Sequence, residues 1–252
     1  YYRPTQFSRI SLEYHTTNEF RRGGNKFDLQ PHETDITEQT KHIINSGGLT
    51  YDVFFNEYKH KLSVYASAQH TDRNSYYGAD KAENAYGKTK DLTAVGGAMY
   101  VGNMDNCLFS PATFTGGVEY QYNSLHDVMT GYGRDLRQDV KIASGFVQNE
   151  WKLDYFTILA GFRLDKHNLV DNVIFSPRIN TLWKPSDKFQ GRLTWSTGFR
   201  APQAYDEDLH VAAVGGEAME VRLAEGLKPE RSNSFSGSVD WSFNSDISSR
   251  TC

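Results

Sequence analysis

Three segments of the sequence alternate between apolar and polar residues. In FTILAGFRLDKH (156–167), the apolar side chains fall on one face and the polar ones largely on the other. FQGRLTWSTGFR (189–200) and SFSGSVDWSF (234–243) repeat the pattern. Because successive side chains of a strand point to opposite faces, this period of two predicts β-strands with one apolar and one polar face.

Weaker alternation predicts further strands along the rest of the chain. Their apolar positions lie in the segments 10–14, 49–55, 62–68, 92–100, 114–122 and 173–183, and one more strand is expected around 138–151. The total is about ten strands. Each is expected to be near the length of about 9 to 11 residues that crosses a bilayer at a tilt.

The predicted connections alternate between short and long. Short turns are expected at NEYKHK (56–61), WKLDY (151–155) and KPSDK (184–188), and longer polar connections near 21–36, 72–89, 127–138 and 200–229. The link at 168–172 is short but falls on the side of the long connections. One rim of short turns and one rim of long loops is typical of a transmembrane β-barrel.

A soluble β-sandwich would also alternate apolar and polar residues. Its polar face is solvated and tends to carry Lys and Glu. Here the polar face is dominated by Ser, Thr, Gln, Asn and Gly, and the apolar face carries Trp and Tyr near strand ends, as aromatic girdles at a membrane interface do. The composition of the two faces therefore favours a barrel.

Composition and charge exclude several other classes of protein. The net charge is −4 and no Lys/Arg-rich run occurs, which argues against binding to nucleic acid. No Ser-His-Asp constellation, Gly-rich phosphate loop or HExxH motif occurs, so the chain is not expected to be an enzyme. Cys107 and Cys252 lie far apart and are compatible with one disulfide or with two unrelated thiols.

Several motifs resemble those of TonB-dependent outer-membrane receptors, in the same order and with similar spacing. They are FVQNEWK (146–152), LAGFRLDKHN (159–168), FSPRINTLWKPSD (175–187), LTWSTGFRAP (193–202) and LKPERSNSFSGSVDW (227–241). The clearest of these motifs cover residues 146–243. Upstream, RRGGNKFDLQPHETDITEQT (21–40) looks like an extracellular loop of this family.

The resemblance implies an all-β fold, an antiparallel 22-stranded transmembrane barrel that is plugged by an N-terminal domain. About ten strands are fewer than half of such a barrel, and no plug is visible, so residues 1–252 are expected to be a barrel fragment. An arc of this kind has two unpaired edges, and unpaired backbone groups each cost several kcal/mol in lipid. The isolated piece is not expected to transport. The last residues, NSDISSRTC, do not resume alternation, which suggests a truncated or altered C-terminus.

The resemblance also implies a function and a set of partners. The expected function is import of a scarce nutrient, namely an iron–siderophore, haem or a corrinoid, across the outer membrane of a Gram-negative bacterium. Energy would come from the TonB–ExbB–ExbD complex acting on a missing N-terminal region, and outer-membrane lipid would surround the barrel. No bond is made or broken, and no cofactor is expected. The alternative is a β-sheet binding or adhesion module at the cell surface that never enters a membrane.

The segment that follows the strand 189–199 carries the candidate ligand contacts. Pro202 cannot donate to a ladder and is expected to end the pairing there. The residues beyond it that would face an incoming ligand are Asp206, Glu207, Asp208 and His210. Three interpretations stay open for them: hydrogen bonds to backbone or to the lumen arginines Arg163, Arg178 and Arg192, a metal or calcium site, or contact with the transported ligand.

Haem is a definite candidate for that ligand because one of two family motifs matches, although the second is missing. Haem receptors of this family carry a FRAP box and a downstream NPNL-like box, with a histidine between them. The matching residues here are Phe199, Arg200, Ala201 and Pro202 for the first box and Lys228, Pro229 and Glu230 beside the second, where AEGLKPE stands in place of NPNLKPE. His210 lies between the two. The pairs Gly96–Gly97 and Gly116–Gly117 fall inside predicted strands, where they fit bulges or close packing against a plug.

Overall fold

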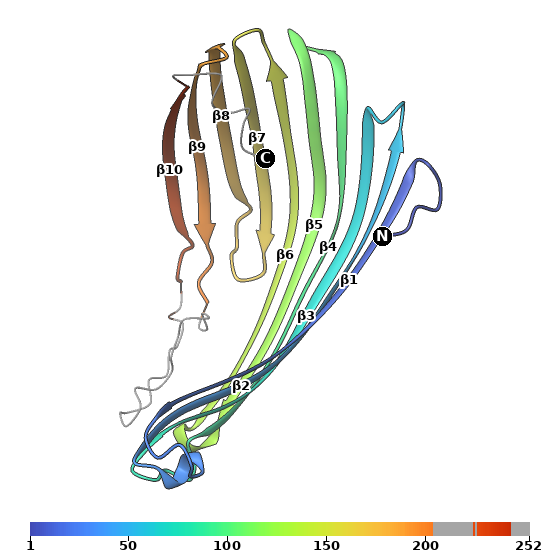
Figure 1. Cartoon of the computed structure of the whole chain (residues 1–252). Helices are drawn as coiled ribbons and strands as arrows, with labels where there is room; N and C mark the ends of the chain where they lie inside the picture. The colour runs from blue at the N-terminus through green and yellow to red at the C-terminus, as the bar shows by residue number, and fades with distance from the viewer. Residues whose placement is uncertain (204–223, 225, 243–252) are drawn as a thin grey trace.

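A computed structural model describes residues 1–203, 224 and 226–242 of the chain. These residues form one antiparallel sheet of ten strands, each paired with its neighbours in chain order. The strands are β1 (Ser8–Gly24), β2 (Ile36–Phe55), β3 (His60–Ala79), β4 (Tyr86–Cys107), β5 (Ser110–Met129), β6 (Arg134–Lys152), β7 (Phe156–His167), β8 (Ile174–Ser186), β9 (Phe189–Arg200) and β10 (Glu230–Trp241). Two short 3-10 helices, η1 (Pro31–Glu33) and η2 (Thr130–Tyr132), lie in connections. The predicted all-β fold of about ten strands is confirmed, and the sheet is open (Figure 1).

The strands fall into two groups by length. β7 to β10 have 12 or 13 residues, near the expected length, whereas β1 to β6 have 17 to 22. The long strands continue well below the lower ends of the short ones (Figure 1). The expected long connections 21–36, 72–89 and 127–138 were therefore too wide, because strand pairing continues to Gly24, Ala79 and Met129. Both ends of the segment 21–40, predicted as a loop, belong to strands.

The apolar face of each long strand explains why its full length was missed. On β4 the apolar positions run from Leu92 to Tyr100, and on β5 from Phe114 to Tyr122, which is about nine residues and matches a bilayer crossing. Beyond this apolar band the same face carries residues such as Lys88, Lys90 and His126. With water on both faces, neither face needs to be apolar, so the period of two disappears while the hydrogen-bonded ladder continues.

The two faces of the sheet differ in burial. Most buried polar residues of the strands, including Asp52, Ser63, Thr89, Asp127, Ser144 and Asp165, belong to the polar face, whereas Ser8 and Thr37, near strand ends, belong to the other. Leu12, Leu193 and Phe235, on the apolar face, are 70 to 78% exposed. Side chains crowd one another on the inside of a curved sheet, so we infer that the polar face is the inner one.

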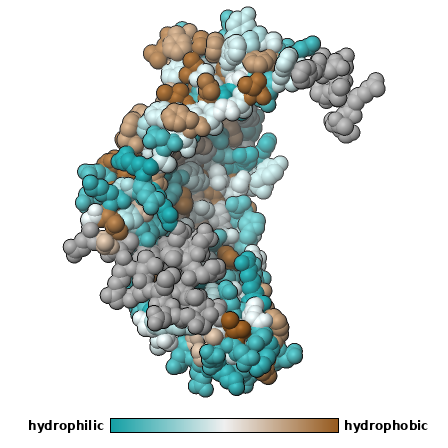
Figure 2. Space-filling view, turned by 90° about the vertical axis from the view of Figure 1, so that its left-hand side faces the viewer, coloured by the Kyte–Doolittle hydropathy of each residue, from teal (hydrophilic) through white to brown (hydrophobic). Residues whose placement is uncertain are grey.

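Aromatic rings follow the rim of short turns from strand to strand. Phe55 stacks on His60, Phe109 on Trp151, and Trp183 contacts both Phe156 and Phe189, with ring centroids 5.3 to 6.4 Å apart. The short turns lie at the upper end of the sheet in Figures 1 and 2. In Figure 2, hydrophobic residues gather at that end, and hydrophilic residues dominate the lower end. Such a row of rings is typical of the girdle where a barrel meets the membrane interface.

The paired glycines inside β4 and β5 make room for aromatic side chains and form no bulges. Pairing continues without a shift through Gly97, opposite Glu119, and Gly117, opposite Met99. A Cβ on Gly97 would lie 2.7 Å from the hydroxyl of Tyr65, which donates a hydrogen bond to Glu119 at 2.8 Å. A Cβ on Gly117 would lie 2.8 Å from the Phe146 ring. Of the two roles predicted for these glycines, a bulge is wrong, because pairing continues without a shift. Close packing against a plug stays a prediction.

No helix among the described residues is long and apolar enough to cross a membrane.

Substituting Leu193 with Arg tests which face meets lipid. Leu193 lies near the middle of β9, and its neighbour Thr194 is on the polar face. A lipid-facing charge near the bilayer midplane costs about 2 to 4 kcal/mol, whereas an inward-facing charge stays hydrated. We expect Leu193→Arg in the full-length protein to lower the folded fraction in lipid vesicles strongly and Thr194→Arg to lower it little, measured by gel mobility before and after heating. Equal losses would contradict the assignment of faces.

Candidate functional site

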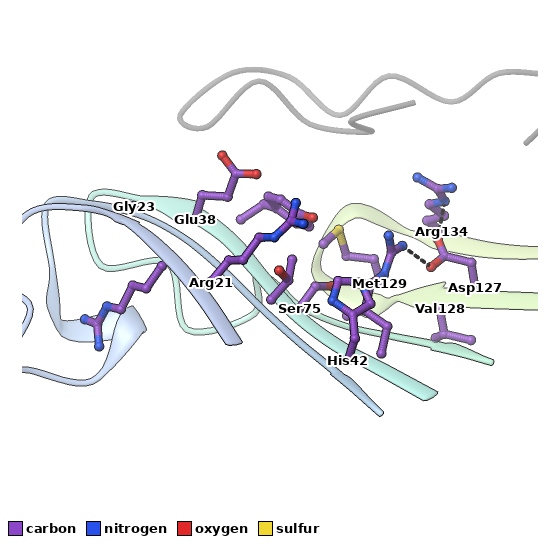
Figure 3. A pocket seen from close by; sticks show the side chains of 14 residues that line it. Arg21, Gly23, Glu38, His42, Ser75, Asp127, Val128, Met129 and Arg134 are labelled. Carbon is purple, nitrogen blue, oxygen red and sulfur yellow. Dashed lines mark hydrogen bonds and ion pairs between the residues drawn. The ribbon is translucent and has the colours of Figure 1, made fainter. Parts of the chain in front are cut away.

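A cavity of about 400 Å³ lies at the end of the sheet that carries the long connections. Its walls come from the extended ends of β1 to β6. The lining residues are Arg21, Arg22, Gly23, Glu38, Thr40, His42, Arg73, Ser75, Tyr77, Gly87, Asp127, Val128, Met129 and Arg134 (Figure 3). We call this the rim cavity.

A buried carboxylate holds two of the arginines in place. Asp127 is 5% exposed and accepts a hydrogen bond from Arg73 Nη2 at 3.3 Å. Its other oxygen lies 2.8 Å from Arg134 Nε. The hydroxyl of Thr89 donates to Asp127 and accepts from Arg73 Nε at 3.0 Å. One negative charge thus fixes two guanidinium groups, which leaves this cluster with a net positive charge.

Two further arginines line the cavity from β1. Arg21 donates two hydrogen bonds to Glu19, at 2.7 and 2.9 Å, and its side chain is 73% exposed. Arg22 donates to the backbone oxygen of Leu29 at 2.7 Å, and its Nε is buried without a hydrogen-bond partner among the described residues. Arg22 follows Arg21 on the opposite face of β1, so the guanidinium groups that face the cavity are those of Arg21, Arg73 and Arg134. The acids beside them are Asp127, Glu38 and Glu19.

His42 adds a polar group with unused hydrogen-bonding capacity. Its Nδ1 is buried and has no hydrogen-bond partner within the described part of the chain. The nearest acid is Glu19, whose Oε2 lies 3.6 Å from that nitrogen. A ligand oxygen or hydroxyl could therefore hydrogen-bond to this ring without displacing a protein partner.

A glycine lies in the tightly packed floor of the cavity. Thr40, Ser75 and Met129 are buried, and Ser75 and Met129 lie against Gly87. A Cβ on Gly87 would lie 2.7 Å from Ser75 Oγ and 3.1 Å from Met129 Cε. A larger residue at position 87 would therefore press into the floor.

The connection between β1 and β2 is closed at its base beside the rim cavity. Asn25 and Lys26 donate to the carboxylate of Asp35 at 3.1 and 2.9 Å. These hydrogen bonds, chiefly that of Lys26, lower the pKa of the Asp35 carboxyl. Thr34 donates to the backbone oxygen of Pro31 at 2.7 Å. The two strand ends are thus tied together across the connection.

A second polar network lies closer to the short-turn rim on the inner face. Glu119 accepts from Tyr65 at 2.8 Å and from Arg163 at 2.9 Å. Arg163 also donates to Asp165 and Ser144, both at 2.7 Å, and Ser144 donates to Asp165 at 2.6 Å. Because these groups satisfy one another across β3, β5, β6 and β7, the network stabilises the inner wall.

The arginines expected in the lumen are thus used in different ways. Arg163 is held by two carboxylates, and Arg178 donates to Gln148. Arg192 has no hydrogen-bond or ion-pair partner within the described ranges, and it lines a second inner cavity of about 450 Å³ together with Arg178. That cavity lies over β6 to β9, away from the rim cavity.

The predicted ligand contacts Asp206, Glu207, Asp208 and His210 lie outside the described residues, so their roles stay predictions. The described motif residues meet across one strand pair. β9 ends at Arg200, two residues before Pro202, and Arg200 lies opposite Glu230 at the start of β10. Ala201 is buried against Val170 and Ile174. The two motifs are therefore neighbours in space although 26 residues or more separate them in sequence.

Residues 1–203, 224 and 226–242 contain no group of three or more His, Cys, Asp or Glu side chains placed to hold a metal ion. Cys252 also lies outside the described residues, and Cys107 forms no disulfide with a described residue.

Reasoning from the sequence missed the rim cavity. Its residues come from six strands and lie in stretches where neither face is apolar. Only the register brings them together, since Arg73 lies opposite Thr89 and Thr89 opposite Asp127. The signal available in the sequence was the recurrence of arginine near the expected long connections, at Arg21, Arg22, Arg73 and Arg134.

Comparison with known proteins identifies relatives of this sheet. A sequence model of the family "TonB dependent receptor-like, beta-barrel" matches residues 1–249. The structure resembles the siderophore receptor PirA from Pseudomonas aeruginosa (TM-score 0.70, 14% identity, covering 96% of this chain and 42% of that chain). No significant match was found among curated protein sequences.

Two other solved structures are similar over a smaller part of the chain. One is a mutant ferric enterobactin receptor from Pseudomonas aeruginosa in complex with enterobactin (TM-score 0.59, 14% identity, 80% of this chain and 32% of that chain). The other is the ferric citrate transporter FecA (TM-score 0.53, 16% identity, 79% of this chain and 34% of that chain). At these identities the likeness concerns the fold. The chain spans less than half the length of each of these three structures.

Replacing Asp127 by Asn tests whether this carboxylate supports the rim cavity. The change leaves two guanidinium groups without their shared counter-charge, and breaking a buried ion pair costs about 3 to 5 kcal/mol. We expect the full-length protein to lose stability by about this amount in urea titrations of the barrel in lipid vesicles. Asp135→Asn, which removes an exposed carboxylate on the same rim, is the control and should change stability by less than about 1 kcal/mol. A small loss in both variants would contradict this role of Asp127.

Proposed function

Because this chain belongs to the TonB-dependent receptor-like β-barrel family, we propose that it forms part of the barrel of an outer-membrane receptor that binds and imports an anionic iron–siderophore. Members of this family are transport receptors of the outer membrane of Gram-negative bacteria and not enzymes. The observation that carries the proposal for this ligand is the arginine-lined rim cavity.

The chemistry of the rim cavity suits an anion rich in oxygen atoms. Arginine presents several N–H donors in a planar fork that matches carboxylates and similar oxygen pairs. Asp127 already orients Arg73 and Arg134, so these side chains would lose little conformational freedom when a ligand binds. The volume of about 400 Å³ lies within the usual range for small-molecule sites.

The names of the similar structures support the same ligand class. They are a siderophore receptor, a receptor bound to enterobactin and a ferric citrate transporter. Haem stays a second candidate because Phe199 to Pro202 match the FRAP box, and a corrinoid is a third. We favour the siderophore since the rim cavity offers guanidinium donors for anionic oxygens.

The domain and partner assignments belong to the same proposal. Residues 1–252 would be a barrel segment of a longer receptor, whose plug and TonB-contacting region lie outside this sequence. Import would then be powered by the TonB–ExbB–ExbD complex, and the apolar band would contact outer-membrane lipid. The share of the similar structures that the chain covers, 42% or less, supports this division.

The alternative of a non-membrane binding or adhesion module makes a different prediction about solubility. Apolar side chains cover one face of the sheet, and 37 large hydrophobic residues of the described part of the chain would meet water in plain buffer. Exposed apolar patches larger than a few hundred Å² are rare on soluble monomers. A full-length protein that is folded and monodisperse without detergent would favour this alternative.

Replacing Arg21 by Ala in the full-length receptor tests the proposed ligand site. Arg21 is held by one exposed carboxylate only, so the change should leave the fold intact. Losing one charge-assisted hydrogen bond, worth about 1.5 to 3 kcal/mol, should raise the Kd for ferric enterobactin or ferric citrate by about 10- to 100-fold. The measurement is fluorescence quenching by the ferric chelate in detergent.

Arg137→Ala is the matched control, because this side chain is also 73% exposed but lies on the outer face. It should leave the Kd unchanged. Tight binding of haem or cobalamin, with no measurable binding of ferric chelates, would move the proposal to one of those ligands. Equal weakening by both substitutions would argue against the rim cavity as the site.

A further inference from the structure

His42 lines the rim cavity (Figure 3) and lies directly opposite Glu19 of β1. Both hydrogen bonds from Arg21 go to Oε1 of Glu19, at 2.7 and 2.9 Å, whereas Oε2 lies 3.6 Å from His42 Nδ1. That separation is longer than a hydrogen bond, and the buried Nδ1 has no other partner among the described residues. A small shift of either side chain would let a protonated Nδ1 donate to Glu19, so the site can hold an extra proton.

The charges that face the rim cavity balance only while His42 is neutral. Three guanidinium groups stand beside three carboxylates, namely Arg21, Arg73 and Arg134 beside Asp127, Glu38 and Glu19. Three positive and three negative charges sum to zero, and a proton on His42 would bring the sum to plus one. The protonation state of one ring therefore decides whether the cavity as a whole attracts an anion.

The charged groups nearest to His42 come from both neighbouring strands. Glu19 and Arg21 belong to β1, and Arg73 lies directly opposite His42 on β3. The remaining charged groups that face the cavity are Glu38 of β2, Asp127 of β5 and Arg134 of β6. Burial of the ring, followed by the charge of Arg73, lowers the pKa of His42, and Glu19 opposes this effect only in part. Without a bound anion the ring is therefore neutral at neutral pH.

This part of β2 lies outside the apolar band. His42 stands opposite Arg73, and Arg73 stands opposite Thr89, beyond Leu92 where the apolar band of β4 ends. The His42 side chain is 19% exposed. Water can therefore deliver a proton to the ring from the side of the long connections.

We propose that His42 takes up a proton when an anion occupies the rim cavity, so that binding is tighter in mildly acidic than in neutral medium. A negative charge within about 4 to 6 Å of a histidine favours its charged form. The charged ring would attract the anion in turn, and its Nδ1 would donate either to the anion or to Glu19. The inference deepens the proposed function, because it concerns the regulation of the same cavity.

The direction of the pH dependence follows from the two states of the cavity. Without the anion the pKa of His42 is lowered, and the anion raises it. Between these two pKa values, binding consumes a proton, so the Kd rises with pH by up to about 10-fold per pH unit. Below both values the ring is charged in either state, and above both it is neutral, so His42 then contributes no pH dependence.

The test compares wild type, His42→Gln and His126→Gln in the full-length receptor. His126 is the matched control, because it lies on the outer face of the same rim, with its Nε2 2.9 Å from Asp135. Binding of ferric enterobactin, ferric citrate and iron-free citrate is measured by titration calorimetry in detergent, at about pH 6 and about pH 7.5, on both sides of the ordinary pKa of histidine. Each titration is repeated in two buffers of different ionisation enthalpy, PIPES and ACES, which gives the number of protons taken up per bound anion. Gel mobility before and after heating confirms that each protein is folded.

We expect the ratio of the Kd at the upper pH to the Kd at the lower pH to be about 3- to 10-fold larger in wild type than in His42→Gln. Wild type should also take up more protons per anion than His42→Gln, whereas His126→Gln should match wild type in both measurements. The titration of the anion itself is common to the three proteins and cancels in these comparisons. Equal ratios and equal proton uptake in wild type and His42→Gln, or the same loss in His126→Gln, would overturn the proposal.

The choice of anions separates this inference from the proposed function. Proton-coupled binding of iron-free citrate, without binding of either ferric chelate, would count against siderophore import alone. Binding of a ferric chelate with the same proton uptake in wild type and His42→Gln would count against the role of His42 alone. An absence of binding by all three anions would overturn both.

Discussion

The structure depends on continuous backbone hydrogen bonding between neighbouring strands. In a bilayer, every unpaired N–H or C=O group costs several kcal/mol, so a strand can lie there only if its neighbours complete the ladder. The ladder runs from β1 to β10, and its register shifts only near Cys107 and Ser186, both beside short turns. A slip of one residue would exchange the two faces of a strand. The apolar band and the polar inner wall therefore both rest on this register.

The sequence predicted those parts of the fold in which the two faces of a strand differ. FTILAGFRLDKH was recognised because Phe162 and Leu164 face away from Arg163 and Asp165, and the structure confirms both the strand and its faces. The extensions of β1 to β6 were missed because Lys88 and Lys90 on the outer face are as polar as Thr89 on the inner one. Where water covers both faces of a strand, the residues do not alternate between apolar and polar, so the sequence does not reveal the hydrogen-bonded ladder.

The rim cavity could not be predicted from the sequence for a related reason. Arg21, Arg73 and Asp127 are separated by about 50 residues from one to the next, and nothing in their local sequence pairs them. They meet because the long strands keep one register through β1 to β6. The motif residues were easier to place, since strand pairing ends next to Pro202 as its chemistry requires. A motif can identify a family from a short segment, whereas a cavity built across a sheet needs the whole register.

The position of the rim cavity has a consequence for how selective such a site can be. Loops often carry binding residues, and their mobility has to be overcome when a ligand binds. Here the described arginines stand on paired strands, and Asp127 fixes two of them through charge-assisted hydrogen bonds. Their spacing is therefore set by the same ladder that holds the sheet together. A ligand whose oxygens match that spacing binds more tightly, because the arginine donors are already in place. A ligand with a different spacing cannot readily move these arginines.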